Sequence, residues 1–322
     1  MKNRLTLIIA FTLCSTVCLD ISFSKDIPTT DEIESEIQNE NIEEILSLLS
    51  HPNWRVQERG VTKLYGAQEL LNNERIKLAV IRLLEEINAD TENLAARLQE
   101  YREKTGEEPP HDWEPEGTIR EEGYGELQLY VLELVEGFKD ERAIHALVGA
   151  IECGAPTMKA VIEFGELAIN PLLERLERTK NRSARSSIIK ALSEIIKRTQ
   201  ISPLPIEGTP TTRTSVKSPT TSQRELIRNT FIKSLNDPGE FVRMNAIRAI
   251  GIIGDTSAIP LLKQIAENDL CVWGTAIGEP TYPVRDGAQR VLKLLEEKKK
   301  EEEKNKGTEE LKTKEQKNYS RP

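Results

Sequence analysis

The sequence predicts an all-α fold made of antiparallel helix pairs. Apolar residues recur with helical spacing along most of the 322 residues, for example at Leu127, Val131 and Leu134. No segment shows the sustained apolar–polar alternation that is typical of a strand. Short clusters rich in Gly, Pro, Asn and Asp, such as 236–239, interrupt the periodic segments. Because these connections are short, consecutive helices are expected to be antiparallel neighbours.

The first element that we predict is a secretory signal peptide at residues 1–24. Lys2 and Arg4 precede an uncharged run from Leu5 to Leu19, and small residues follow at Ser22 and Ser24. The uncharged run of 15 residues is shorter than the roughly 17–25 that a bilayer span needs. We therefore expect the chain to be exported to a periplasmic or extracellular location. Membrane contact is expected only if the signal stays uncleaved as an anchor.

Two helical segments are expected after the signal, at 25–198 and 223–297, because two patterns alternate within them. The first is Ala-Ile-x-x-Leu at the start of a helix. The second starts the following helix with an apolar and a basic residue, and continues with small or apolar residues four, seven and eight positions later. Those offsets lie on one helix face, where a small residue allows close helix–helix approach. The first pattern begins at Ala143, Ala168 and Ala258, and the second at Ala184, Val242 and Val284, with a degenerate copy at Val56.

The stretch from Asp237 to Leu262 resembles HEAT repeats, in the short bacterial form named after phycobilisome lyases. The resemblance is strong over about 140–198 and 223–295 and weaker over 41–103. It implies an α-solenoid, an armadillo-like superhelix of about six or seven helix pairs, in which each pair buries its apolar face by stacking on its neighbours. It also implies a structural ladder in which recurrent arginines pair with acidic turn residues such as Asp237. The matching arginines are Arg185, Arg243 and Arg285.

Three insertions and a tail interrupt this repetition. An acidic loop is expected at 104–122, either as a solvated loop or as a contact loop anchored by Trp113. Residues 199–222 are predicted to be a flexible linker, because 15 of the 24 are Pro, Thr or Ser and offer little apolar surface to bury. Residues 298–322 are predicted to be a charged, disordered tail that extends the last helix only briefly.

A loop at 269–283 is the first-ranked candidate for partner contacts. It separates two helices of one repeat and holds Trp273 and Tyr282. Loops that a rigid scaffold positions often carry binding. A concentration of basic residues gives two further candidates, Arg178 and Arg182, although a solvated face combined with the arginine ladder also explains that concentration.

The sequence offers no constellation for catalysis. We expect no metal site and no cofactor, since the spacings of His and Cys that hold zinc and the glycine-rich nucleotide loops are missing. Cys153 and Cys271 either pair in an oxidising compartment or remain two buried free thiols. The net charge of −9 argues against nucleic acid as a partner, because phosphate binding needs a basic surface.

We therefore expect a non-catalytic scaffold that mediates protein–protein interaction outside the cytoplasm. The alternative is an accessory or chaperone subunit of an enzyme or of a system that assembles cofactor-bearing proteins. The resemblance does not carry lyase activity over to this chain, because many binding proteins share the repeat.

Overall fold

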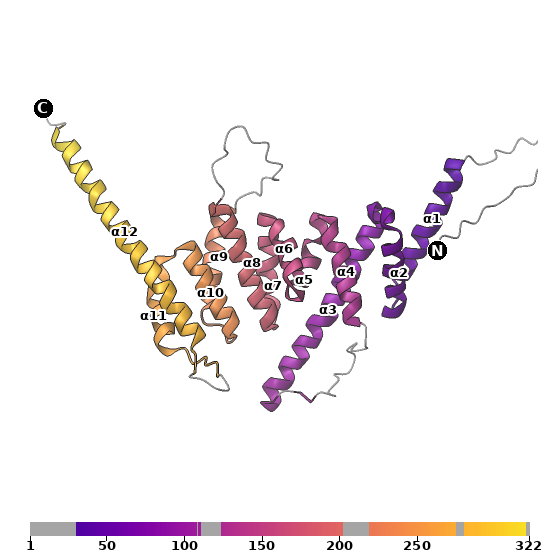
Figure 1. Cartoon of the computed structure of the whole chain (residues 1–322), viewed down its shortest axis with the longest axis horizontal. Coiled ribbons are helices and arrows are strands. Elements are labelled where there is room, and N and C mark those ends of the chain that lie inside the picture. The colour runs from indigo at the N-terminus through magenta and orange to yellow at the C-terminus, as the bar shows by residue number, and fades with distance from the viewer. Residues whose placement is uncertain (1–29, 108, 111–123, 202–218, 275–279, 320–322) are drawn as a thin grey trace, which may run out of the picture. The chain divides into compact units, whose positions relative to one another are not determined.

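A computed structural model of the chain describes residues 30–107, 109–110, 124–201, 219–274 and 280–319 (Figure 1). These residues form twelve α-helices and five short 3-10 helices, and no strand. The one β-bridge among them joins Trp273 and Thr281. The all-α prediction is therefore confirmed. The chain divides into two compact units, 1–43 and 44–322, and what the structure describes of the first is part of helix α1 (Thr30–Leu49).

Within the second unit, helices pack against each other as pairs in chain order (Figure 1). The pairs are α3 with α4, α5 with α6, α7 with α8, α9 with α10, and α11 with α12. The second helices also form a series, in which α4, α6, α8, α10 and α12 each pack on the next. The bounds are α2 (Trp54–Gly66), α3 (Glu74–Thr105), α4 (Tyr124–Phe138), α5 (Ile144–Gly149), α6 (Ala155–Glu163), α7 (Ile169–Arg178), α8 (Arg182–Ile201), α9 (Thr221–Ser234), α10 (Glu240–Ile253), α11 (Ile259–Asn268) and α12 (Pro283–Tyr319).

The residues at the repeated positions of the sequence patterns are buried on one helix face, as α10 shows. Val242, Ala246 and Ala249 of α10 are all buried. The small residue four positions into the second pattern lies where helices approach closely. At Gly60 of α2, a Cβ atom would lie only 2.9 Å from the Cβ of Leu48. A close approach of this kind requires glycine there.

Local capping explains where many of the helices begin and end. The side chains of Asn53, Asn73 and Asn181 accept hydrogen bonds from backbone N–H groups in the first turns of α2, α3 and α8. Gly106 and Gly254 adopt left-handed backbone conformations, with φ of 72° and 69°, directly after α3 and α10. Glycine adopts this conformation without steric cost, so it ends a helix at a defined position.

Several helices differ in length from the roughly 10–18 residues that the turn signals suggest. α3 has 32 residues and α12 has 37, whereas α5 and α6 have only 6 and 9. Gly154, which has φ of 149°, separates the two short helices, and Pro156 lies in the first turn of α6, where its missing amide proton costs no helical hydrogen bond. Five 3-10 segments lie between α-helices. They are η1 (Gln68–Asn72), η2 (Glu141–Ala143), η3 (Ile151–Cys153), η4 (Gly165–Ala168) and η5 (Thr256–Ala258).

The expected disordered tail at 298–322 is wrong for most of its length, because α12 continues to Tyr319. Lys and Glu are good helix formers, and pairs four residues apart support one another on an exposed helix. One such pair joins Lys298 to Glu302 at 3.8 Å. Lys298 also donates to the backbone carbonyl of Gly254, which attaches the helix at this point to the end of α10.

The ends of the expected linker at 199–222 are also helical. α8 extends to Ile201, and α9 begins after Thr220, whose side chain and that of Gln223 form a reciprocal capping box. Similarly, the first two residues of the expected acidic loop at 104–122 belong to α3. The signal segment 1–24, the linker interior at 202–218 and Trp113 lie outside the described residues.

None of the helices in the described part of the chain is both long and apolar enough to cross a membrane.

Candidate protein-interaction surface

A ladder of arginines joins three successive connections between paired helices. Arg185 of α8 pairs with Asp237, which precedes α10, through Nε–Oδ2 at 3.0 Å and Nη2–Oδ1 at 3.1 Å. Arg243 of α10 donates two hydrogen bonds to Asp269, from Nε at 2.7 Å and from Nη2 at 3.1 Å, whereas Arg185 donates to Asp237 only from Nη2 and its Nε makes an ion-pair contact. The structural ladder that the resemblance implies is therefore present at these two positions. Arg285 differs, because its Nε donates to the backbone carbonyl of Asp269.

The two aspartates of the ladder also shape their own turns. Oδ1 of Asp237 accepts from the backbone N–H of Gly239 at 2.8 Å, and Oδ1 of Asp269 accepts from that of Cys271 at 2.9 Å. Each carboxylate therefore fixes the backbone that follows it while holding an arginine from the preceding helix pair. Two-pronged arginine–carboxylate pairs have a defined geometry. The turns 236–239 and 269–274 are thus held against their neighbours.

Four apolar residues are exposed at these turns, and we call them the aromatic edge: Phe241, Leu270, Val272 and Trp273. Their exposed fractions are 54%, 86%, 48% and 40%. The rings of Phe241 and Trp273 lie 5.7 Å apart, centroid to centroid, at an interplanar angle of 45°. Large apolar side chains gathered at one exposed site, unlike single ones, are typical of contact surfaces. The aromatic edge is therefore the candidate site.

Trp273 and Tyr282, two of the residues that the sequence singled out, lie in the connection between α11 and α12. Trp273 and Thr281 exchange backbone hydrogen bonds of 2.9 and 3.0 Å, which holds the Trp273 backbone in place. Tyr282 is half-buried, and the Arg285 guanidinium lies over its ring at 4.6 Å from the centroid. Trp273 therefore presents its ring at the surface, whereas the Tyr282 ring is covered on one side.

Arg178 and Arg182, the other two candidates that the structure describes, flank the turn between α7 and α8. Together with Lys180 they form what we call the basic turn, and all three side chains are exposed. This turn lies beside the start of α10, since a Cβ atom on Gly239 would be 3.8 Å from that of Arg182. The structure therefore places the basic turn next to the turn that carries Phe241.

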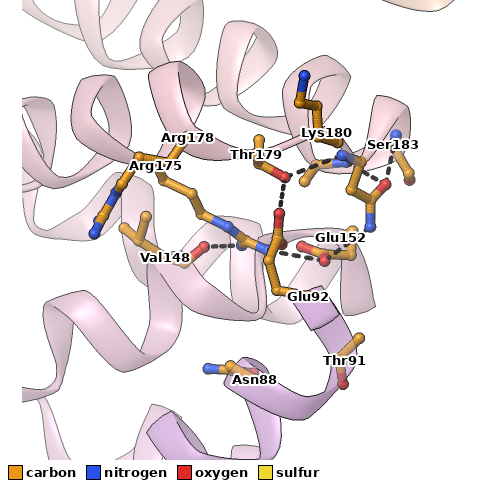
Figure 2. Close-up of polar contacts among 12 residues, drawn as sticks. Asn88, Thr91, Glu92, Val148, Glu152, Arg175, Arg178, Thr179, Lys180 and Ser183 are labelled. Carbon is orange, nitrogen blue, oxygen red and sulfur yellow. Dashed lines mark hydrogen bonds and ion pairs between the residues drawn. The ribbon is translucent and has the colours of Figure 1, made fainter. Parts of the chain in front are cut away.

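Arg175, which belongs to the same concentration of basic residues, has a different environment. Its side chain is only 10% exposed and its guanidinium contacts Glu152 at 2.9 Å, Glu92 at 3.3 Å and the carbonyl oxygen of Val148. Figure 2 shows this cluster, in which Thr179 also donates to Glu92. The cluster joins α3, η3 and the end of α7. Both terminal nitrogens of the guanidinium, Nη1 and Nη2, bind groups within the fold, so Arg175 has a structural role.

Sequence reasoning missed Phe241 as a part of the surface. The signal for Phe241 was available, because Val242 and Ala246 mark the buried face of α10. Phe241 falls off that face, together with the polar Asn245 and Arg248. Its contact with Trp273 joins positions 32 residues apart, and no sequence periodicity predicts such a pairing.

Two kinds of side chain among the described residues bear on possible chemistry: the cysteines and the groups that could bind a metal ion. Both Cys153 and Cys271 are free thiols. Burial, followed by the charge of Glu152, raises the pKa of Cys153 to about 11, so its reactive thiolate form is scarce at neutral pH. Burial likewise raises the pKa of Cys271. Over the described part of the chain, no three His, Cys, Asp or Glu side chains gather as a metal site requires.

The comparison with protein families gives one finding. Residues 242–268 match the family described as PBS lyase HEAT-like repeat, and this stretch covers α10 after its first two residues, η5 and α11. No curated protein sequence is similar enough to this chain to count as a match. The matched residues begin with the Val242-Arg243 pair of the second pattern and include the arginine that binds Asp269. The chain therefore contains a HEAT-like repeat at residues 242–268.

Proposed function

We propose that this chain is a non-catalytic scaffold that holds a protein partner at the aromatic edge. The observation that carries the proposal is the exposed Phe241–Trp273 pair on turns that arginine–aspartate pairs hold in place. Helical repeats of the matched kind typically mediate protein interactions. Buried aromatic anchors dominate the energetics of such interfaces.

The proposal includes an α-solenoid arrangement of the helix pairs. It is supported by the packing of each second helix, from α4 to α12, on the next one. In such an array each pair contacts mainly its neighbours, so a surface residue changes binding without disturbing distant pairs. A rigid stack would also present the turns of successive pairs along one edge, where a partner can contact several of them together.

We further propose that the protein acts outside the cytoplasm, where the basic and apolar amino-terminal segment would direct it. The absence of catalysis is supported by the raised pKa of the Cys153 thiol, which argues against a cysteine nucleophile at neutral pH.

The experiment is affinity purification of the full chain from the envelope fraction of its native cells. It compares the parent protein with a variant in which Phe241 and Trp273 are both changed to serine. The control variant changes two other exposed apolar residues, Leu129 and Leu294, which are 55% and 58% exposed. Both variants lose similar apolar surface, and all four positions are exposed, so both are expected to fold.

We expect a set of partner proteins that the parent and the Leu129→Ser/Leu294→Ser control retain and that the Phe241→Ser/Trp273→Ser variant loses. Partners that all three proteins retain would place binding elsewhere and contradict the aromatic edge. A parent protein that retains no partner would contradict the scaffold function itself.

A further inference from the structure

We propose that the aromatic edge and the basic turn together bind an extended acidic segment of the partner, with an apolar side chain seated on Phe241 and Trp273. This inference rests on the proposed function and adds the chemistry of the segment that is bound. It is carried by three exposed cations without ion-pair partners in the described chain and by their place on the fold beside the aromatic edge.

The basic turn carries charge that the fold does not use. Arg178, Lys180 and Arg182 are exposed, and none forms an ion pair with a described residue. Arg178 only donates to the backbone carbonyl of Glu174 in its own helix, at 3.3 Å. By contrast, the neighbouring Arg175 and Arg185 are both held by carboxylates. The exposed cations are therefore available to an anionic partner.

Arg182 in particular occupies a position that is unfavourable for helix stability. It is the first residue of α8, and this helix has no acidic residue in its first turn. The N-terminus of a helix carries a partial positive charge and favours anions, so a cation there costs stability. Lys180 lies two residues before it. Together with the helix end, these side chains produce a positive potential that a carboxylate of a partner would relieve.

The charges around the basic turn are partly paired. Asp237 and Asp269 are paired with Arg185 and Arg243, and on the other side of the turn Arg175 pairs with Glu92 and Glu152. The exposed Glu174 and Glu177 of α7 precede Arg178, and Glu240 of α10 precedes Phe241. No acidic residue stands between Arg178 and Arg185, so the cations of the basic turn form an uninterrupted basic stretch in a protein whose overall charge is −9.

The spacing of these turns fits an extended segment of about six residues. The basic turn abuts Gly239, two residues before Phe241, and Phe241 contacts Trp273 on the next turn. Neighbouring helices pack about 8–10 Å apart, so the three turns span roughly 20 Å. An extended chain rises about 3.3 Å per residue and covers that distance with about six residues. Acidic residues and an aromatic or aliphatic residue would therefore lie about four to six positions apart.

The test is selection of a random 12-residue peptide library, displayed on phage, against the immobilised full chain. We expect the selected peptides to be enriched in Asp and Glu with one aromatic or aliphatic residue about four to six positions away. Binding of a synthetic selected peptide should fall about tenfold or more in the Arg178→Glu/Lys180→Glu/Arg182→Glu variant, and also at high salt, which screens exposed charges. The Phe241→Ser/Trp273→Ser variant should weaken it as well.

A matched control carries the same change of charge on another exposed surface, through Lys293→Glu, Lys299→Glu and Lys300→Glu in α12. This control should bind the peptide as the parent does. If both triple variants lost peptide binding equally, the loss would come from the net charge of the protein and not from the basic turn. That result would overturn the proposal. Selected peptides without acidic residues would also overturn it.

Two further outcomes separate this inference from the proposed function. If envelope partners are lost from the Phe241→Ser/Trp273→Ser variant but retained by the charge-reversed basic turn, the scaffold stands and the acidic segment is refuted. If the parent sediments with vesicles of phosphatidylglycerol and the charge-reversed variant does not, while no peptide is selected, the basic turn binds anionic lipid and the peptide proposal is overturned.

Discussion

At the scale of single residues, arginines with the same sequence context have opposite roles in this protein. Arg175 and Arg178 stand three positions apart in α7, yet one is buried among carboxylates and the other is exposed. Composition places both in one basic cluster. Only the packing of α3 and η3 against α7 separates them, through Glu92 and Glu152. A residue's charge predicts neither its partners nor its role.

The first prediction concerns these two arginines. Arg175→Met keeps most of the apolar stem but leaves Glu152 and the Val148 carbonyl without their shared donor. Removing one partner of a buried ion pair typically costs about 3–5 kcal/mol, because the other charge stays buried. Arg178→Met, on the exposed face, should change stability by less than about 0.5 kcal/mol. Urea unfolding followed by circular dichroism checks both values. A loss in Arg175→Met no larger than that in Arg178→Met would contradict the cluster's structural role.

A second prediction at this scale follows from the pKa of about 11 for the Cys153 thiol. At pH 8 about one molecule in a thousand would carry the thiolate, against about a quarter for an unperturbed cysteine of pKa near 8.5. Iodoacetamide reacts with the thiolate, so alkylation at Cys153 in the native chain should be at least about 100-fold slower than in urea. Mass spectrometry of tryptic peptides assigns the label to Cys153. Equal rates in the native and unfolded chain would show that burial does not control this thiol.

At the scale of elements, the sequence predicted helix identity better than helix length. The pattern beginning at Val242 correctly marked the buried face of α10, because a 3.6-residue period is a local property. The lengths of α3 and α12 were missed, since good helix formers continue both helices past their last buried residues, Asn88 and Leu295. The turn at Gly154 was also missed, because a single glycine inside an apolar run does not reveal its φ angle.

The third prediction compares two glycines of the same helix, α2. A Cβ atom at Gly60 would meet Leu48 at 2.9 Å, whereas one at Gly66 would meet nothing within 4 Å. Overpacking lowers the free energy of unfolding by about 1–3 kcal/mol, whereas the better helix propensity of alanine raises it by about 1 kcal/mol. We therefore expect Gly60→Ala to lower the urea midpoint or leave it unchanged, and Gly66→Ala to raise it slightly. The two midpoints should differ by the equivalent of about 1–3 kcal/mol. Equal midpoints would show that α2 does not pack closely on the end of α1.

At the scale of the whole molecule, sequence repetition predicted the HEAT-like repeat that the family comparison finds at 242–268, whereas the contact surface became visible only in the structure. Alternating patterns are visible in a sequence because each repeat places the same residue types at the same offsets. The aromatic edge arises instead from irregular parts, where the α11–α12 connection brings Trp273 to Phe241. Of the five residues that the sequence singled out, Trp273, Arg178 and Arg182 are exposed at neighbouring turns. Tyr282 is half-buried beside them, and Trp113 lies outside the described residues.

The fourth prediction tests the central claim, that the aromatic edge contacts a protein partner. A photo-crosslinking amino acid, p-benzoylphenylalanine, is placed at position 241 of the full chain in its native cells, and at position 129 as the control. Both side chains are about half exposed, at 54% and 55%. After irradiation, we expect a discrete crosslinked band from position 241 that is missing from position 129. A crosslink from position 129 alone, or none from position 241, would contradict it.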